Sequence, residues 1–242
     1  MLPALTTALR LLSVLPIPGR EAKRFSDGIT WFPLVGGILG WLVVGIACLL
    51  QLLAPDWPAL PALGALIAGV ALTRGFHLDG VADCADGFWG GFTAERRLEI
   101  MKDSHIGAFG VLALVLLLIG KYAAYQEIMA NQNVLLIPLA FSASRMSIVL
   151  LAYRFRYPRQ TGTAAAIVNE AKSAHFIGAL ILSLLLIIYS PVTGLIILAT
   201  AALVALGIGY FSRNRIGGVT GDVLGASCEL TELIALLIIA CR

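Results

Sequence analysis

Residues 107–120 read GAFGVLALVLLLIG, a stretch in which no side chain is charged. The apolar segment around this stretch runs from Ile106 to Ala130 and would extend about 37 Å as an α-helix. That length exceeds the roughly 30 Å of hydrocarbon in a bilayer. The segment is therefore predicted to be a transmembrane helix.

The same signal recurs along the chain. Of the 242 residues, 59% are hydrophobic and 13% are charged, about half the charged share of soluble domains. We therefore expect an all-α, polytopic integral membrane protein in which residues 1–242 form one helical domain. Six or seven transmembrane helices are predicted, because one of the further apolar segments is short for a span. These segments are Ile29–Leu53, Ala59–Phe76, Val134–Tyr153, Ala174–Tyr189, Val192–Phe211 and Val223–Ala240.

A short amphipathic pattern precedes the first span. Leu5, Leu9 and Leu12 recur at helical spacing, with polar side chains on the opposite face, and Pro16 follows them. This pattern predicts an N-terminal helix that lies in the membrane interface.

The basic residues predict the orientation in the membrane. All of the 17 Lys and Arg except Lys121, Arg145 and Arg242 lie near the N-terminus or near three longer connections. Basic loops stay on the cytoplasmic side of a bacterial inner membrane, so we expect the N-terminus and these connections to lie there. The net charge of +3 is too small to indicate nucleic-acid binding. The three connections are 77–105, 154–173 and 212–222.

Three aspartates follow the second apolar segment in the stretch HLDGVADCADG, residues 77–87. At 100° per residue, Asp79, Asp83 and Asp86 lie within roughly 60° of one another on one helix face. Their repulsion near a bilayer predicts a bound divalent cation, and oxygen-only ligands favour Mg²⁺, with Mn²⁺ as a substitute. Glu99 and Asp103 are predicted to complete the metal site from a second helix.

A solvated cytoplasmic loop, in which the acids pair with nearby arginines, is the alternative interpretation. The glycines at 80, 87, 90 and 91 favour the metal site because they leave space for a bulky ligand. On a helix, His77 would point away from the aspartates, which favours a hydrogen-bonding role over metal ligation. His105 begins a helix and either caps it or contacts phosphate, and both interpretations stay open.

A second polar stretch, residues 213–222, reads RNRIGGVTGD and runs into the last span. A glycine-rich turn at a helix N-terminus presents N–H groups and a positive dipole end to a phosphate. We therefore predict that Arg213, Arg215, Thr220 and Asp222 contact the substrate. An ordinary loop with Asp222 as the N-cap is an equally supported alternative.

Charged side chains also occur inside the predicted spans. Glu229 and Glu232 lie in the last span, where an unpaired carboxylate is costly. Lys121 and Arg145, inside two other spans, are the expected partners. Whether such ion pairs would be structural or functional stays open.

A carboxylate metal site near arginines, without a serine or cysteine nucleophile motif, predicts phosphoryl transfer. Asp83 and Asp86 are the candidate general bases, and His77 is placed in the catalytic set beside them. A CDP-alcohol phosphotransferase is one physical analogy, since its signature opens like Asp83-x-x-Asp86-Gly87, although the continuation differs here. A divalent-cation transporter is disfavoured because the acids lie at the end of a span.

Several motifs resemble those of the cobalamin synthase family, the adenosylcobinamide-GDP ribazoletransferases. The resemblance covers nearly the whole chain and retains every acidic position of the motifs. These motifs are HLDGVAD with Asp86-Gly87, Met101-Lys102-Asp103-Ser104 followed by Gly107 and Gly110, Leu15-Pro16-Ile17-Pro18, and Thr220-Gly221-Asp222 followed by Gly225, Ala226 and Glu229.

The resemblance implies the last assembly step of the cobamide nucleotide loop. A ribosyl hydroxyl of α-ribazole, or of its 5′-phosphate, would attack the cobinamide-linked phosphorus of adenosylcobinamide-GDP. GMP would leave, with Mg²⁺ as the cofactor. Arg96, Ser104 and His105 are expected among the substrate contacts. Membrane lipid, a second copy of the chain and other corrinoid-pathway enzymes are the further partners considered.

Overall fold

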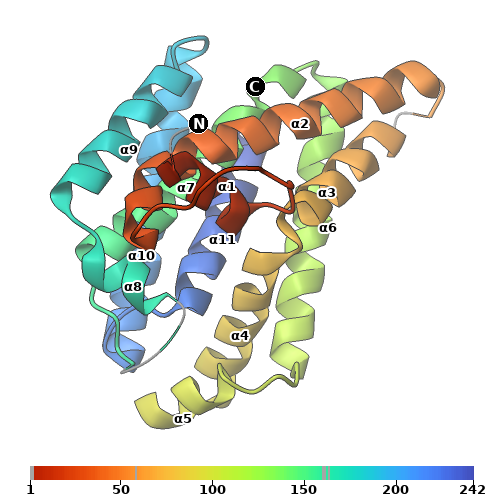
Figure 1. The fold of residues 1–242 in the computed structure, drawn as a ribbon. Helices are drawn as coiled ribbons and strands as arrows, with labels where there is room; N and C mark the ends of the chain where they lie inside the picture. Colours follow the sequence, from red (N-terminus) through yellow and green to blue (C-terminus); the bar gives the residue numbers. More distant parts are fainter. Residues whose placement is uncertain (1–2, 58, 160–161, 163) are drawn as a thin grey trace.

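A computed structural model describes residues 3–57, 59–159, 162 and 164–242. All regular structure in these residues is helical (Figure 1). The α-helices are α1 (Pro3–Leu12), α2 (Phe32–Leu53), α3 (Ala59–Thr73), α4 (Phe76–Gly90), α5 (Ala94–Ile100), α6 (Ala108–Ala130), α7 (Ile137–Arg154), α8 (Ala165–Glu170), α9 (Ser173–Leu186), α10 (Pro191–Ile216) and α11 (Gly221–Ala240). Two 3₁₀ helices, η1 (Phe25–Trp31) and η2 (Val134–Leu136), lead into α2 and α7.

Five helical segments are long and apolar enough to cross a membrane. The pair α3 and α4, bent by 89°, passes the same test together and would make a sixth span. The chain is therefore an all-α, multi-pass membrane protein, as predicted. A seventh span would require α9, whose 14 residues extend only about 21 Å and fall short of the hydrocarbon thickness. The five segments are Phe25–Leu53, Ala108–Ala130, Val134–Arg154, Pro191–Ile216 and Gly221–Ala240.

The bend between α3 and α4 arises from two consecutive residues in the left-handed region. Arg74 has φ 56° and Gly75 has φ 61°. The Gly75 N–H donates to the Val70 carbonyl and the Arg74 N–H donates to the Ala71 carbonyl, which is the Schellman pattern that ends a helix. The span predicted to continue to Phe76 therefore stops at Thr73. The chain then turns into α4, which carries the three aspartates on a helix, as their spacing predicted, within the stretch 77–105 that was expected to connect two spans.

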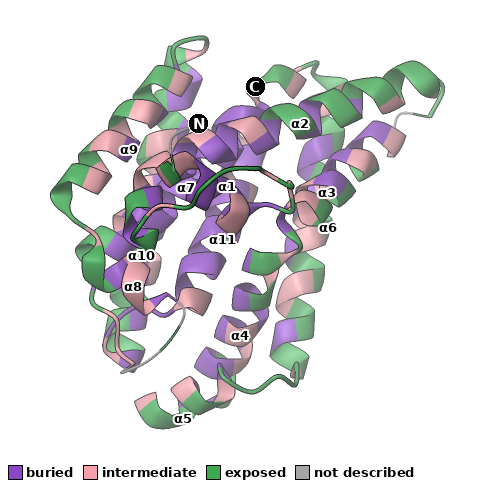
Figure 2. Ribbon diagram, viewed as in Figure 1, coloured by how far each residue is buried: buried purple, intermediate pink, exposed green. Residues whose placement is uncertain are grey.

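Two helices, α7 and α11, form the centre of the bundle, and both are largely buried (Figure 2). Small residues let neighbouring helices approach closely. A Cβ at Gly36 of α2 would collide with the Phe141 carbonyl of α7, and a Cβ at Gly40 would lie 2.5 Å from the Pro138 Cα. Close contacts of this kind stabilise helix pairs inside a bilayer. There the hydrophobic effect does not drive helices together, because lipid tails are as apolar as the side chains.

The connections segregate to two ends of the bundle, as the sequence predicted. At one end, Arg97 of α5 donates to the Arg215 carbonyl, and the Val219 N–H donates to the Arg156 carbonyl. At the other end, the Asn131 side chain donates to the Ala240 carbonyl across 2.9 Å.

The N-terminal helix α1 is amphipathic, but its buried face differs from the one expected. Leu9 and Leu12 are buried, and so are Thr6, from the predicted polar face, and the neighbouring Thr7. The Thr7 hydroxyl accepts a hydrogen bond from the Ala22 N–H across 2.8 Å. Because α1 packs on η1 and α2, its buried face contacts the protein itself and does not lie only on a membrane surface.

Candidate active site

The site is built where α4 crosses α11. A Cβ at Gly80 would lie 2.5 Å from the Asp222 carbonyl oxygen, and a Cβ at Gly225 would lie 3.1 Å from the His77 carbonyl oxygen. Only glycines allow the two backbones to come this close. The crossing therefore brings the aspartates of α4 beside Asp222, the second residue of α11.

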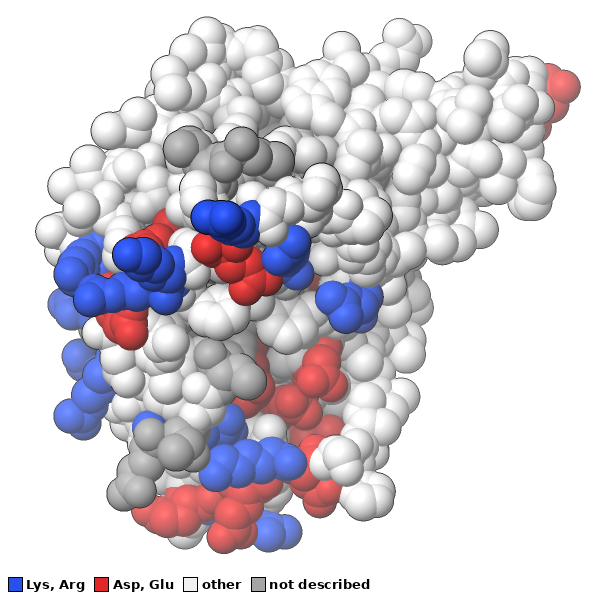
Figure 3. Space-filling model, viewed as in Figure 1, with Lys and Arg blue, Asp and Glu red and all other residues white. Residues whose placement is uncertain are grey.

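Four aspartates share this region with one arginine. Asp83 is half-buried, and the charges that act on it are those of Asp79, Asp222, Asp86 and Arg159. Asp79 is exposed, whereas Asp222 is half-buried. Figure 3 shows acidic atoms gathered in a hollow at the foot of the molecule, with basic atoms around it. Asp79, Asp83 and Asp86 all lie on α4, and the charges of Asp79, Asp86 and Asp222 act on Asp83.

Asp222 has two polar partners of its own. The Thr220 hydroxyl donates to its Oδ2 across 3.1 Å, and an Arg159 Nη2 lies 3.3 Å from the same oxygen. The N-cap of α11 is Thr220, whose Oγ1 accepts from the Val223 N–H, so the alternative with Asp222 as N-cap is wrong. Asp222 is therefore left to face the other carboxylates. Thr220, predicted to bind substrate, is buried and holds Asp222 in place.

Asp86 is tied to the next helix. Its Oδ2 accepts from the Gly107 N–H across 2.7 Å and its Oδ1 accepts from the Gly110 N–H across 2.9 Å. These N–H groups belong to the first turn of α6, where intrahelical acceptors are missing. A Cβ on Gly107 or on Gly110 would collide with the Asp86 carboxylate. The two glycines are thus required for this cap.

Glu99 and Asp103 have nearer partners than the aspartates of α4. Glu99 pairs on the surface with Arg96 across 3.1 Å. Asp103 accepts from the Nδ1 of His105 across 2.7 Å, and this hydrogen bond lowers the pKa of the Asp103 carboxyl. Within the described ranges, no three Asp, Glu, His or Cys side chains stand close enough to hold one metal ion. The five predicted ligands are thus not assembled as one cage.

Five of the seven predicted substrate contacts are exposed, and we call these five the rim residues. Arg96, Ser104 and His105 are exposed in and after α5. Arg213 and Arg215 are exposed at the end of α10, where each guanidinium lies 5.0 Å from an aromatic ring, that of Tyr210 or of Phe211. Among the described residues, none of these five side chains forms a hydrogen bond or ion pair with Asp79, Asp83, Asp86 or Asp222.

The glycine-rich turn between α10 and α11 packs against the chain after α7. Gly217, at φ 84°, ends α10, and its carbonyl accepts from Arg156 Nε across 3.1 Å. A Cβ at Gly218 would collide with the Arg156 carbonyl. Gly217 and Gly218 belong to the turn that was predicted to bind phosphate through its N–H groups. In the structure they pack against Arg156 and bring it, with the nearby Arg159, to the N-terminus of α11.

His77 is buried at the start of α4 and its ring lies 5.3 Å from that of Phe76. Its Nδ1 has no hydrogen-bond partner among the described residues. The residue contributes to the wall of a cavity that also reaches Asp79 and Asp222. The expected hydrogen-bonding role thus has an unused polar atom available to it.

The charges inside the spans pair as predicted. Lys121 Nζ lies 2.6 Å from Glu229 and 2.8 Å from Glu232, and Arg145 pairs with Glu232. All four side chains are almost fully buried. Two cations and two anions give this network no net charge, and it connects α6, α7 and α11.

Arg159 is the functional candidate that the sequence analysis missed. Its signal was the run Arg154, Arg156 and Arg159 in a polar connection. Arg154 and Arg156 were considered as an interfacial anchor or a phosphate contact, whereas Arg159 was used only to predict the orientation. The contact with Asp222 depends on the fold, because these residues lie far apart in sequence.

The family model for cobalamin-5-phosphate synthase matches residues 4–240 of the chain. A curated adenosylcobinamide-GDP ribazoletransferase from Chlorobaculum tepidum is 42% identical, and the match covers 99% of this chain and 96% of that protein. One of the same name from Chlorobium phaeobacteroides is 43% identical, covering 95% and 94%. A third, from Chlorobaculum parvum, is 42% identical, covering 96% and 93%. No solved structure matches the chain.

Proposed function

The chain belongs to the cobalamin-5-phosphate synthase family, and we propose that it joins adenosylcobinamide-GDP to α-ribazole, or to α-ribazole 5′-phosphate, with release of GMP. The names of the relatives supply the substrates. The observation that carries the proposal is the group of aspartates at the α4–α11 crossing with Arg159 beside it. Such a group suits the displacement of a nucleotide from a pyrophosphate.

The reaction forms one bond and breaks one. A ribose hydroxyl oxygen attacks the cobinamide-linked phosphorus, the bond from that phosphorus to the GMP oxygen breaks, and the hydroxyl proton passes to a carboxylate. Asp83 is the stronger candidate for this general base. Both oxygens of Asp86 already accept backbone hydrogen bonds, whereas no hydrogen bond engages Asp83 among the described residues.

The donors of Asp79, Asp83 and Asp222 are all carboxylate oxygens, which Mg²⁺ prefers. Because no three of the described acids stand close enough to hold one ion, one or two of these carboxylates would hold Mg²⁺ together with the phosphates of the substrate. When bound, Mg²⁺ or Mn²⁺ would neutralise the phosphate oxygens and help to hold the leaving group in line. Arg159 holds the Asp222 carboxylate in position and adds a positive charge for the phosphate. The rim residues Arg213 and Arg215 would meet the substrate as it enters.

The location follows from the distribution of charge. Lys and Arg gather around the acidic hollow and are missing from the top of the view, where the tip of the α2–α3 hairpin carries an acidic spot (Figure 3). By the positive-inside rule, the hollow faces the cytoplasm of a bacterial inner membrane. Nucleotide substrates are available on that side.

The test is release of GMP by the purified full-length protein from adenosylcobinamide-GDP and α-ribazole with Mg²⁺. Asp83→Asn should lower the rate by at least about a hundredfold, the usual scale for loss of a general base. Glu127→Gln, which removes an exposed carboxylate from the opposite end of α6, is the matched control. Near-normal turnover by Asp83→Asn at saturating Mg²⁺ would refute the assignment, and release of CMP from a CDP-alcohol would replace the proposed reaction.

A further inference from the structure

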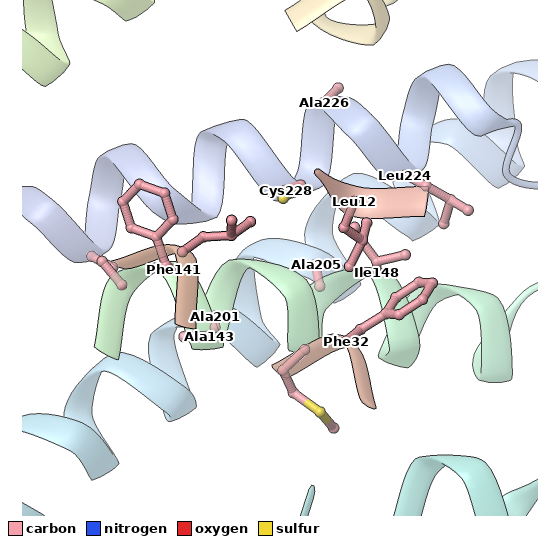
Figure 4. Close-up of a cluster of buried hydrophobic side chains, with 14 of the residues drawn as sticks. Leu12, Phe32, Phe141, Ala143, Ile148, Ala201, Ala205, Leu224, Ala226 and Cys228 are labelled. Atoms are coloured by element: carbon pink, nitrogen blue, oxygen red, sulfur yellow. The ribbon is translucent and has the colours of Figure 1, made fainter. Parts of the chain in front are cut away.

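A cavity of about 210 Å³ opens beside the aspartates, between α1, α4, α7, α8 and α11. Most of its lining is apolar. Leu12, Phe32, Ile148 and Leu224 form part of the wall, and Figure 4 shows these four side chains converging from α1, α2, α7 and α11. We call this space the α1–α11 cavity.

The polar groups of the α1–α11 cavity are few. Asp79 and Asp222 lie on its wall next to the proposed reaction centre. His77 also lines the cavity, is 4% exposed, and has an Nδ1 without a partner among the described residues. A buried polar atom without a partner costs free energy, so a ligand that supplies one hydrogen bond here would be favoured.

We propose that the α1–α11 cavity binds the two-ring aromatic base of the nucleoside acceptor, with the acceptor's ribose at Asp79 and Asp222. This inference rests on the proposed function and adds the place where the acceptor is recognised. The apolar wall would bury the faces and C–H edges of the rings. The Nδ1 of His77 would donate to the ring nitrogen that carries no sugar.

The size of the cavity separates the base from the corrinoid. The cavity has a volume of about 210 Å³. That volume suits a flat two-ring base and is too small for a macrocycle of four such rings with amide side chains. The corrinoid therefore has to lie outside the cavity.

The polarity of the wall separates the acceptor's base from the guanine of the donor. Guanine carries several hydrogen-bonding groups on its edges, and leaving them unpaired in an apolar wall would be costly. A benzimidazole-type base has a single free ring nitrogen, which can accept a hydrogen bond from a ring N–H of His77. The acceptor's base is thus the better chemical match.

Ile167 provides the test because it lines the cavity from α8 and is only half-buried, so its replacement spares the core. Ile167→Trp should fill the cavity. We expect the KM for α-ribazole to rise at least about tenfold, the low end for steric exclusion from an apolar pocket. The kcat and the KM for adenosylcobinamide-GDP should stay within about twofold of the unchanged protein. Leu184→Trp, at an exposed position of α9, is the control.

Ile167→Ala should act in the opposite direction and improve the use of acceptors with bulkier bases. Equilibrium dialysis of α-ribazole without donor gives a second readout, in which the Kd of Ile167→Trp should rise by the same factor. A rise in the donor KM alone would assign the cavity to guanine and overturn the inference, as would unchanged values for both substrates. If the unchanged protein released no GMP, the proposed function would fail, whereas a weaker binding of α-ribazole to Ile167→Trp would still support the cavity.

Discussion

Replacing Asp86 by Asn separates a structural role of this carboxylate from a chemical one. The carboxylate accepts two backbone hydrogen bonds, of 2.7 and 2.9 Å, from the first turn of α6. An amide keeps one acceptor oxygen and turns an NH₂ group toward the other N–H. One charge-assisted hydrogen bond is lost, and one backbone N–H is left without a partner.

The expected loss of stability can be built from these contacts. A hydrogen bond to a charged group contributes about 1.5–3 kcal/mol, and a negative charge at a helix N-terminus adds about 0.3–1 kcal/mol. The free energy of unfolding of Asp86→Asn should therefore fall by about 2–4 kcal/mol. For a chain of this size, that corresponds to a Tm lower by roughly 5–15 °C.

The assay is thermal unfolding of the full-length protein in one detergent or nanodisc, followed by intrinsic fluorescence. Asp83→Asn is the matched control, because it removes the same charge from the same helix without breaking a hydrogen bond. Its Tm should hold or rise, since repulsion among the aspartates is relieved. Equal Tm values for Asp86→Asn and the unchanged protein would refute the capping role. Asp86 would then matter for chemistry alone.

Three further outcomes are expected. Gly107→Ala should lower the Tm as Asp86→Asn does, because its Cβ would displace the same carboxylate; an unchanged Tm would contradict this account. Lys121→Met should destabilise the protein by about 3–5 kcal/mol by leaving the buried Glu229 carboxylate unpaired, since Glu232 keeps Arg145, and adding Glu229→Gln should recover part of that loss in the same melt; no recovery would mean that the pair is not coupled. In intact cells, a cysteine at Phe92 should resist an impermeant reagent, whereas one at Gln132 should react; the reverse pattern would invert the proposed orientation.

The charges inside the spans show what the sequence could predict. An unpaired charge in a bilayer is costly, so Lys121 and Arg145 had to meet the two acids of the last span. The structure confirms these pairs in a network of no net charge. Five span positions were predictable because apolar length is a local property of the sequence, whereas the predicted spans Ala174–Tyr189 and Ala59–Phe76 correspond to the short α9 and to α3, which ends at Thr73.

The acidic site was only partly predictable. Helix periodicity placed Asp79, Asp83 and Asp86 on one face, but it could not show that Asp222 approaches them, because that depends on how α4 crosses α11. The spacing of Glu99 and Asp103, four residues apart, also led us to predict both as metal ligands. Each of those acids has a basic partner within three residues in the chain, and such local pairs form without any help from the fold.

The bend before α4 has a similar explanation. Gly75 lay inside the predicted span Ala59–Phe76, and the left-handed Arg74 gave no local signal, since such a conformation costs an ordinary side chain about 1–2 kcal/mol. That cost has to be offset by packing elsewhere, above all between α4 and α11. The sequence could therefore not reveal that one apolar segment ends and a second helix starts at a steep angle.

The geometry of the aspartates is held by contacts on both sides of the reaction centre. On one side, Asp86 fixes α4 to the N-terminus of α6. On the other, α6 is joined to α11 by Lys121, which contacts Glu229 and Glu232 about two turns or more beyond Asp222. Since Gly80 also rests on the Asp222 backbone, α4 cannot slide along α11 without breaking a buried contact. The carboxylates are thus positioned by rigid helices, and we propose that the neutral network inside the bundle supports the reaction by keeping α11, and with it Asp222, in register with α4.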